Sequence, residues 1–412
     1  MHGRGVIGAE VESTQDLIEL EKKYFLPVGK RLPVTLVRGD GVSVWDLEGR
    51  RYIDFVAGIA AVSLGHCHPA VVEAITRQAA ELMHTSNYYY TVPQVKLAEL
   101  LCQSAKMDKV FFCNSGAEAV EGLIKTARKW GKEKREGAYE IIVAENAFHG
   151  RTMATVSAAG TEKYRAPFAP LVEGFVRVPF NDIEAIKKAT TAKTAAVLLE
   201  PVQGEGGVNI PHDSYLPAVR EWCDEAGILL MLDEVQSGVG RTGKLFAYQH
   251  YGILPDVMAV AKALGGGFPI GAFLTLDHCA VMGQGEHGTT FGGNALACEV
   301  GYTVLKYMLD HDIPGEAAKR GQYVERRLHS LADRHPLITE VRGMGLIWAI
   351  ELGGPLAEQA MNMCLEEGLL INNVKPTALR MIPPLTVTEG EIDGAIEIID
   401  RVLGRLEAQP AK

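Results

Sequence analysis

The stretch Leu229-Leu230-Met231-Leu232-Asp233-Glu234-Val235-Gln236 ends an apolar run in a carboxylate, and a later run, Ala259-Val260-Ala261, ends in Lys262. Short runs that are apolar all round predict strands that are buried on both faces of a parallel sheet. A carboxylate at the end of such a strand can keep a ring nitrogen protonated, and a lysine amine can form a Schiff base with an aldehyde. This pair therefore predicts a site for a pyridine aldehyde at a sheet edge.

Apolar runs alternate with amphipathic segments in the middle of the chain. One helical pattern begins near Ser214, which could cap it, and Gly227 could end it, while a shorter pattern covers residues 182–189. This alternation predicts βα units and an α/β fold with a mainly parallel sheet. We expect its buried strands at residues 110–113, 141–144, 195–199, 228–232 and 257–261.

The C-terminal part of the chain has a different pattern. Residues 341–351 and 379–382 predict strands, and Thr388 with Glu391 forms a capping-box pattern before a closing amphipathic helix. These elements predict a smaller α+β unit.

Bulk composition excludes several classes of protein. The 412 residues include 41 Lys+Arg and 51 Asp+Glu, a formal net charge of −10, which disfavours a nucleic-acid binder with a basic face. No apolar run is long enough to cross a bilayer, and the acidic N-terminal segment resembles neither a secretory signal nor a transit peptide. The seven cysteines are scattered and odd in number, which favours reduced thiols and a cytoplasmic enzyme.

The segment Asn114-Ser115-Gly116-Ala117-Glu118 follows the expected strand at 110–113. Backbone N–H groups at a helix start, together with a serine hydroxyl and a small glycine, form an anion site. An ordinary strand-to-helix turn has the same residues, so this segment alone leaves both interpretations open.

Two further strand ends carry chemically useful groups. Phe148-His149-Gly150-Arg151-Thr152 offers an aromatic ring that can stack on a flat cofactor and an arginine that can bind a carboxylate through two bonds. Glu200-Pro201-Val202-Gln203-Gly204-Glu205 places two glutamates after a buried run. A core phenylalanine, a surface arginine and a polar turn are the structural alternatives. For Asp233 and Lys262 the alternatives are a helix cap and a surface lysine.

Taken together and in order, these segments resemble the class III aminotransferases, which are pyridoxal-phosphate enzymes of fold type I, the aspartate aminotransferase-like fold. The resemblance implies a large PLP-binding domain at 63–300, a C-terminal small domain at 301–412, and an N-terminal segment, 1–62, that packs with the small domain. Further matching segments are Gly65-His66-Cys67-His68-Pro69, Leu232-Asp233-Glu234-Val235-Gln236, Lys262-Ala263-Leu264-Gly265-Gly266-Gly267, His287-Gly288-Thr289-Thr290-Phe291-Gly292-Gly293-Asn294 and Arg380-Met381-Ile382-Pro383-Pro384.

The resemblance implies a role for each residue of the cofactor site. Lys262 would bind the aldehyde of pyridoxal phosphate, and Asp233 would pair with its ring nitrogen. Thr290 would reach the phosphate of the neighbouring subunit's cofactor, which implies a homodimer with shared active sites. The remaining contacts would come from Gln236 near the phenolic oxygen, Val235 and Phe148 on the two ring faces, and Ser115, Gly116 and Ala117 around the phosphate.

The resemblance also implies a site for two substrates. Within the class, the chain most resembles the enzymes that move the δ-amino group of N2-acetylornithine to 2-oxoglutarate in arginine biosynthesis. Arg151 would hold the α-carboxylate of the amino donor, and Arg380 would hold that of glutamate or 2-oxoglutarate. Glu205 would neutralise Arg380 when the other substrate is bound, so that no buried cation is left unpaired.

Ile59 bears on the choice of donor. Related ornithine aminotransferases carry at this position a tyrosine that contacts the free α-amino group, and isoleucine cannot make that hydrogen bond. The residue therefore favours a donor whose α-nitrogen is acylated. The 4-aminobutyrate enzymes also accept isoleucine here, and succinylornithine and acyl-lysine enzymes are close relatives, so these alternatives stay open.

Other classes of function are weaker alternatives. A PLP-dependent aminomutase shares the fold but needs no second keto acid, and a binding protein without cofactor would need neither Asp233 nor Lys262. The sequence His66-Cys67-His68 has too few ligands for a zinc site, so we expect no metal. Residues 87–90, Asn-Tyr-Tyr-Tyr, could stack nucleic-acid bases but lack basic neighbours. The Gly265-Gly266-Gly267 run lacks the spacing of a dinucleotide-binding loop.

Overall fold

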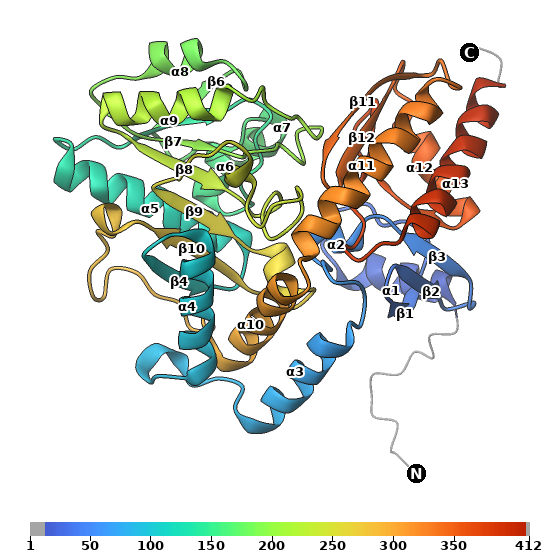
Figure 1. Cartoon of the computed structure of the whole chain (residues 1–412), viewed down its shortest axis with the longest axis horizontal. Coiled ribbons are helices and arrows are strands. Elements are labelled where there is room, and N and C mark those ends of the chain that lie inside the picture. The colour runs from blue at the N-terminus through green and yellow to red at the C-terminus, as the bar shows by residue number, and fades with distance from the viewer. Residues whose placement is uncertain (1–12, 409–412) are drawn as a thin grey trace.

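The larger lobe of the molecule is built on a seven-stranded sheet (Figure 1). The computed structural model describes residues 13–408 of the chain. Across the sheet the strands follow in the order β4 (Lys109–Cys113), β10 (Gly271–Thr275), β9 (Val257–Val260), β8 (Leu229–Asp233), β7 (Thr194–Leu199), β5 (Glu140–Ala144) and β6 (Phe175–Val178).

All of these strands except β10 run in the same direction, because β10 alone is antiparallel to its neighbours β4 and β9. The expectation of a mainly parallel sheet is confirmed, and each of the five expected strands is present. Strands β6 and β10 are additional to those expected, and β8 extends by one residue to include Asp233. The shared direction brings the carboxyl ends of β4, β5, β7, β8 and β9 to one edge, where ligands bind in open α/β sheets.

Helices cover both faces of this sheet. In β7, Ala196 and Leu198 belong to the apolar cluster that includes residues of α5 (Gly116–Lys134), whereas Val197 and Leu199 belong to the cluster on the other face. Successive side chains of a strand point to opposite faces, so a strand covered on both must be apolar throughout. The second cluster includes residues of α4 (Val92–Ala105), α8 (Ile183–Ala189), α9 (Tyr215–Ala226) and α10 (Ala295–Asp310).

The two helices expected between the strands are α8 and α9. Asp182 caps α8, since its side chain accepts a hydrogen bond from the backbone N–H of Ala185. Gly227 ends α9 in the left-handed region, with φ of 61°, as glycine permits without strain. Ser214 occupies the N-cap position of α9 but makes no side-chain capping bond, so the expected cap is correct only in its position.

The smaller lobe contains an antiparallel sheet with the order β11 (Ile338–Met344), β12 (Ile347–Leu352), β15 (Ala378–Met381) and β14 (Asn372–Lys375). The expected strand at 341–351 is wrong as a single strand, because it turns at Gly345, whose φ is 56°, and continues as β12. The capping box of Thr388 and Glu391 is confirmed at the start of α13 (Glu389–Glu407). Helices α11 (Ile313–Ala332) and α12 (Ala357–Glu367) complete this lobe.

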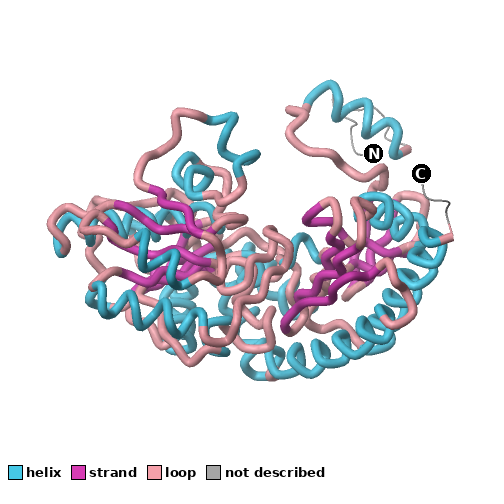
Figure 2. Tube along the Cα trace, turned by 90° about the horizontal axis from the view of Figure 1, so that it is seen from above, coloured by secondary structure: helices cyan, strands magenta, loops and turns pink. Residues whose placement is uncertain are grey.

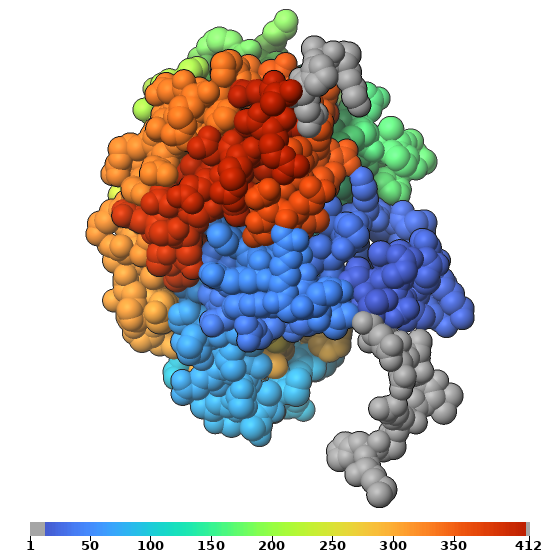
Figure 3. Space-filling view, turned by 90° about the vertical axis from the view of Figure 1, so that its right-hand side faces the viewer, coloured from blue at the N-terminus to red at the C-terminus, as the bar shows by residue number. Residues whose placement is uncertain are grey.

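The N-terminal strands lie against the C-terminal part of the chain (Figure 3). Strands β1 (Leu36–Asp40), β2 (Ser43–Asp46) and β3 (Arg51–Asp54) form a sheet that is completed by β13 (Leu369–Leu370), which is parallel to β3. Figure 2 shows the two lobes side by side, with α1 (Thr14–Tyr24) standing apart from both. No side chain of α1 is buried.

Neither a membrane span nor a metal cluster is found among residues 13–408. No helix in this range combines the length and the apolar character needed to cross a membrane. Three or more potential metal ligands do not gather anywhere in it. In the segment considered for zinc, the His66 ring bonds to the Asp54 carboxylate at 2.7 Å, and His68 packs edge-on against Tyr307, with ring centroids 4.6 Å apart.

A buried histidine links α13 to the rest of the smaller lobe. His335 Nδ1 lies 2.8 Å from Glu407 Oε2, and its Nε2 lies 2.5 Å from Asp400 Oδ1. Burial alone would lower the pKa of His335, but its hydrogen bonds to Asp400 and Glu407 raise the pKa above the ordinary value. A raised folded-state pKa means that the protonated form stabilises the fold below the unfolded pKa, and that this stability is lost as pH rises through the folded pKa.

We therefore predict that His335→Gln lowers the midpoint temperature of thermal unfolding more at pH 5.5 than at pH 8.5. Glutamine keeps a donor and an acceptor but cannot carry the charge. The measurement is the difference in midpoint between variant and wild type at each pH. A difference that is the same at both values would contradict the assigned role of the charge.

Candidate active site

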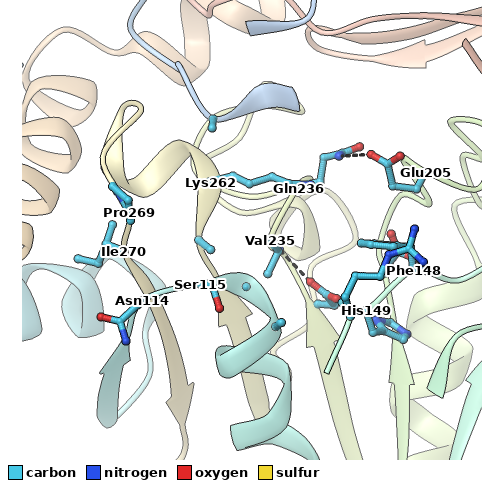
Figure 4. Close-up of a pocket in the computed structure, with 18 of the residues that line it drawn as sticks. Asn114, Ser115, Phe148, His149, Glu205, Val235, Gln236, Lys262, Pro269 and Ile270 are labelled. Atoms are coloured by element: carbon cyan, nitrogen blue, oxygen red, sulfur yellow. Dashed lines mark hydrogen bonds and ion pairs between the residues drawn. The ribbon is translucent and has the colours of Figure 1, made fainter. Parts of the chain in front are cut away.

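A cavity of about 470 Å³ opens at the carboxyl edge of the parallel strands (Figure 4). Lys262 extends across it towards Gln236, while Asn114 and Ser115 lie on the opposite side of the view. Its walls come from the segments that follow β4, β5, β7, β8 and β9, as the shared strand direction requires. The lining residues are Ala61, Asn114, Ser115, Gly116, Ala117, Phe148, His149, Gly150, Arg151, Glu200, Glu205, Asp233, Val235, Gln236, Ala261, Lys262, Gly267, Phe268, Pro269 and Ile270.

The start of α5 forms one end of the cavity. Ser115 is its N-cap, with extended backbone, and its Oγ accepts a hydrogen bond from the N–H of Glu118 at 3.2 Å. A Cβ atom added at Gly116 would lie 2.7 Å from Val235 Cγ1, so only glycine lets the helix start approach that side chain. The free N–H groups of a helix start, reached through small residues, suit a phosphate.

Asp233 is held beside this helix start by partners on both of its oxygens. It is 5% exposed, and an unpaired carboxylate at that depth would be costly. Oδ2 lies 2.8 Å from Nδ1 of the buried His149, and Oδ1 accepts a hydrogen bond from the N–H of Val235 at 3.0 Å. These contacts fix the carboxylate at the cavity wall.

A second buried carboxylate, Glu200, lies in the same wall. Its Oε1 accepts a hydrogen bond from the backbone N–H of Phe148 at 2.8 Å, which positions the Phe148 ring at the cavity. Burial, and then the neighbouring charge of Asp233, raise the pKa of Glu200 well above its ordinary value. The two carboxylates are therefore electrostatically linked, and the protonated form of Glu200 is favoured.

Lys262 is the amine of the cavity. Burial lowers the pKa of its ammonium group, and the charge of Arg380 lowers it further, against the opposing effects of Glu205, Asp233 and Glu200. The neutral, nucleophilic form is thereby favoured. Its backbone φ of 38° is unusual for a residue with a side chain, and such strain is commonly found at functional sites.

Arg380 and Glu205 form an ion pair beside the cavity. Arg380, from β15, is fully buried, and its Nη1 donates to Glu205 Oε1 at 2.6 Å and to Gln236 Oε1 at 3.1 Å. Nε donates to Asn372 Oδ1 at 3.3 Å, while Nη2 has no partner among residues 13–408. Burial alone would raise the pKa of Glu205, but the charges of Arg380 and Lys262 lower it below its ordinary value.

Arg151 stands at the outer part of the cavity and is exposed. Its guanidinium carbon lies 4.2 Å from the ring centroid of Tyr164, in α7 (Glu162–Arg165), and 5.3 Å from that of Phe148. No carboxylate is bonded to it within the described part of the chain. An arginine that packs against two rings and has no carboxylate partner in this part of the chain can bind a carboxylate of a ligand.

The structure gathers most of the residues that the sequence analysis predicts. Three of them do not line the cavity. Arg380 lies behind Glu205 and Gln236, Ile59 is 44% exposed on the left-handed turn α2 (Ala57–Ala60), and Thr290 is exposed on the loop before α10. Asn114, His149 and Glu200 are site residues to which the sequence analysis assigns no role. Their signals in the sequence are their position next to predicted strand ends and their place in the segments that resemble the class III aminotransferases.

The walls of one cavity carry a helix start with small residues, a buried carboxylate and a lysine. These groups fit, in that order, the phosphate, the ring nitrogen and the aldehyde of a single flat molecule. The chain belongs to the class-III aminotransferases, whose family model matches residues 25–403. It is a transaminase that depends on pyridoxal phosphate. Its fold is the one shared by these enzymes.

Individual relatives cover nearly the whole chain. The acetylornithine aminotransferase of Caldanaerobacter subterraneus is 49% identical over 95% of this chain and all of its own length, and that of Methanocaldococcus jannaschii is 49% identical over 96% and 100%. Among solved structures, an ornithine aminotransferase of Toxoplasma gondii matches with a TM-score of 0.94, 32% identity and coverage of 98% and 99%. The acetylornithine aminotransferase of Elizabethkingia anophelis matches with a TM-score of 0.86, 36% identity and coverage of 95% and 99%.

We predict that borohydride treatment of the wild-type enzyme loaded with pyridoxal phosphate leaves the cofactor attached through denaturation, and that Lys262→Ala abolishes this attachment. The reason is that reduction fixes only a cofactor bound to an amine, and Lys262 is the amine of the cavity. The measurement is the absorbance and mass of the denatured chain. Lys188→Ala, on α8, is the matched control. Retention of the label by Lys262→Ala at the wild-type ratio would contradict the assignment.

Proposed function

We propose that this enzyme transfers the δ-amino group of N2-acetylornithine to 2-oxoglutarate, which yields N-acetylglutamate 5-semialdehyde and glutamate, a step of arginine biosynthesis. The observation that carries the proposal is the presence of two arginines for two substrate carboxylates, Arg151 at the outer part of the cavity and Arg380 paired with Glu205. The names of the relatives, acetylornithine aminotransferases that are 43 to 49% identical over more than nine-tenths of the chain, support the same donor.

The cofactor would be held by the residues around the cavity. Ser115, Gly116 and Ala117 would bind its phosphate, Val235 and Phe148 would pack on the two faces of its ring, Gln236 would lie near the phenolic oxygen, and Asp233 and Lys262 would take the ring nitrogen and the aldehyde. When bound, pyridoxal phosphate supplies the aldehyde that takes up the amino group and a ring that draws electrons from the donor's C–H bond.

The chain's own residues would then direct the reaction. Asp233, held by His149, keeps a negative charge at the ring nitrogen and so keeps that nitrogen protonated. The amino group of Lys262, whose pKa is lowered by burial, would accept the proton that leaves the substrate carbon and would hold it for return to the product.

Arg151 and Arg380 would bind the two substrates in turn. The carboxylate of acetylornithine is far from its reacting amine, so it would reach Arg151 at the outer part of the cavity. Glutamate and 2-oxoglutarate carry their α-carboxylate next to the reacting carbon, and the free Nη2 of Arg380 would bind it. Glu205 would turn away at that moment and would pair with Arg380 again in the other half-reaction, so that the buried cation always has a partner.

The test of the donor is a panel of acetylornithine, succinylornithine, ornithine, 4-aminobutyrate and acyl-lysine with 2-oxoglutarate. We expect turnover of acetylornithine well above that of free ornithine and 4-aminobutyrate. Arg151→Ala should raise KM for acetylornithine at least tenfold, since the charged pair with its carboxylate is lost. Glutamate does not use Arg151 in this scheme, and its KM should change far less.

Three results would contradict this scheme. Equal losses for acetylornithine and glutamate in Arg151→Ala would show that the two carboxylates are wrongly assigned. A strong preference for 4-aminobutyrate would replace acetylornithine as the donor. Activity without any keto acid would favour the aminomutase instead.

We also propose that the enzyme is a homodimer with shared active sites, in which Thr290 binds the phosphate of the partner's cofactor. Thr290 and its neighbour Phe291, 60% exposed, do not line the cavity of their own chain. Tyr88, Tyr89 and Tyr90 are 89%, 71% and 98% exposed, and aromatic surface of that extent is typical of interfaces. All seven cysteines are free, which supports a reducing, cytoplasmic location.

Shared sites predict complementation between two inactive variants. Lys262→Ala and Thr290→Glu should each abolish activity, the second because a carboxylate at this position repels the phosphate. After the two variants are dissociated and mixed, each heterodimer would contain one site with both native residues, and about a quarter of wild-type activity should return. The measurement is activity against mixing ratio. If mixing restores no activity while heterodimers form, Thr290 does not act across the interface.

A further inference from the structure

A second buried arginine, Arg241, joins the two lobes. It belongs to the segment of the larger lobe between β8 and the short helix η3 (Ala247–His250), which also carries Gln236. Its side chain is fully buried, and its hydrogen bonds lead to the smaller lobe. Neither the binding of the cofactor nor that of the substrates, as proposed above, uses this residue. A buried cation without an assigned task therefore lies close to the active site.

The guanidinium of Arg241 holds the end of a strand pair in the smaller lobe. Its Nη1 donates to the carbonyl oxygen of Leu346 at 2.9 Å and to that of Pro383 at 2.5 Å. Strands β12 and β15 pair as far as Trp348 and Met381, and the same register, continued, would place Leu346 opposite Pro383. Proline has no N–H, so the ladder of hydrogen bonds cannot continue there, and the arginine supplies a donor to both carbonyls instead.

Backbone contacts hold the same junction. The N–H of Leu346 donates to the carbonyl oxygen of Arg241 at 2.9 Å. Gly345, at the turn between β11 and β12, lies so close that an added Cβ would be 2.7 Å from that oxygen. The turn and the end of β15 are therefore both attached to the larger lobe at Arg241. Arg380 lies in β15 shortly before Pro383, so the position of its backbone depends on this attachment.

The charge of Arg241 has no counterion among residues 13–408. Its Nε and Nη2 have no hydrogen-bond partner in that range, and no carboxylate there is paired with it. Burial, and then the charge of Arg380, lower the pKa of Arg241 to about 9, so the group stays protonated at neutral pH. A buried cation of this kind is costly, and an apolar side chain of similar size would serve packing alone at lower cost.

A substrate carboxylate would balance this charge. In the site without substrate, Arg241 and Arg380 have one carboxylate between them, that of Glu205. The α-carboxylate of glutamate or 2-oxoglutarate would bring a second negative charge to the same place. The two arginines are therefore matched in number by carboxylates only when one of these substrates is bound, and the extra positive charge favours their binding.

We propose that Arg241 is a positioning residue for Arg380 and thereby sets the affinity of the enzyme for glutamate and 2-oxoglutarate. The inference rests on the role of Arg380 in the proposed function and deepens it. Through Pro383, Arg241 fixes the end of the strand from which Arg380 extends, and through its charge it strengthens the attraction for a carboxylate there. Acetylornithine, whose carboxylate would be bound by Arg151, depends on neither effect.

The test compares two half-reactions of the enzyme loaded with pyridoxal phosphate, each followed by the change in cofactor absorbance with a single amino donor. Arg241→Met removes the charge and the donors, and we expect it to raise the half-saturating concentration of glutamate about tenfold. That of N2-acetylornithine should change by less than about twofold. Arg241→Lys keeps the charge and enough donors for both carbonyls, so it should recover most of the affinity for glutamate.

Two further variants separate positioning from folding. Arg135 also donates through Nη1 to two backbone carbonyls, those of Ala226 and Gly227, but it does not line the active-site cavity. Arg135→Met should therefore leave the ratio of the two half-saturating concentrations unchanged. Arg241→Gln keeps a donor without the charge, should weaken glutamate by a smaller factor of about three, and provides the test if Arg241→Met does not fold. The ratio does not depend on the fraction of active enzyme.

Equal losses for glutamate and acetylornithine in Arg241→Met would overturn this inference, because they would show a structural role alone. An unchanged affinity for glutamate, or an Arg241→Lys variant that behaves like Arg241→Met, would overturn it as well.

Arg380→Gln distinguishes such a failure from a failure of the proposed function. It should raise the half-saturating concentration of glutamate at least as much as Arg241→Met does. If Arg380→Gln leaves glutamate unaffected, the role proposed for Arg380 is wrong, and that of Arg241 with it. If Arg380→Gln weakens glutamate and Arg241→Met does not, only the role of Arg241 is wrong.

Discussion

The buried carboxylate of Asp233 is the constraint on which the site depends. At 5% exposure it needs a partner for each oxygen, and His149 and the N–H of Val235 supply them. Because His149 follows β5 while Asp233 ends β8, their bond joins two loops across the sheet edge. The Phe148 ring is carried into the cavity by the same loop, and its N–H is held by Glu200 after β7. Two buried carboxylates, Asp233 and Glu200, thus tie the segment after β5 to the ends of β8 and β7.

The second constraint is the buried cation Arg380. It comes from the sheet of the smaller lobe, yet its ion-pair partner Glu205 and its acceptor Gln236 come from the larger one. The pairing therefore joins the two lobes beside the cavity. The Nη1 of this arginine is bound and its Nη2 is free. It can therefore exchange a protein carboxylate for a substrate carboxylate without a large change in its own environment. Packing between the lobes and the choice of substrate are consequently linked.

Chemistry and specificity occupy different places in this fold. The lysine and the carboxylates lie on the ends of buried strands, where rigid packing fixes their geometry. Arg151 and Tyr164 lie in a loop and in the short helix α7 at the outer part of the cavity, where residues can change without disturbing the core. This separation lets related enzymes keep one reaction while their donors differ.

The sequence by itself determined five of the seven strands of the large sheet and the chemistry at their ends, because apolar runs must be buried and each of these is followed by a polar residue that meets the others at one edge. Only the tertiary structure decided which of these side chains pair with one another. Arg380 and Glu205 are 175 residues apart, and His149 and Asp233 are 84 apart, so no local pattern reveals either contact. The reversed direction of β10, the turn at Gly345 and the exposure of Ile59 and Thr290 likewise depend on neighbours that are distant in the chain.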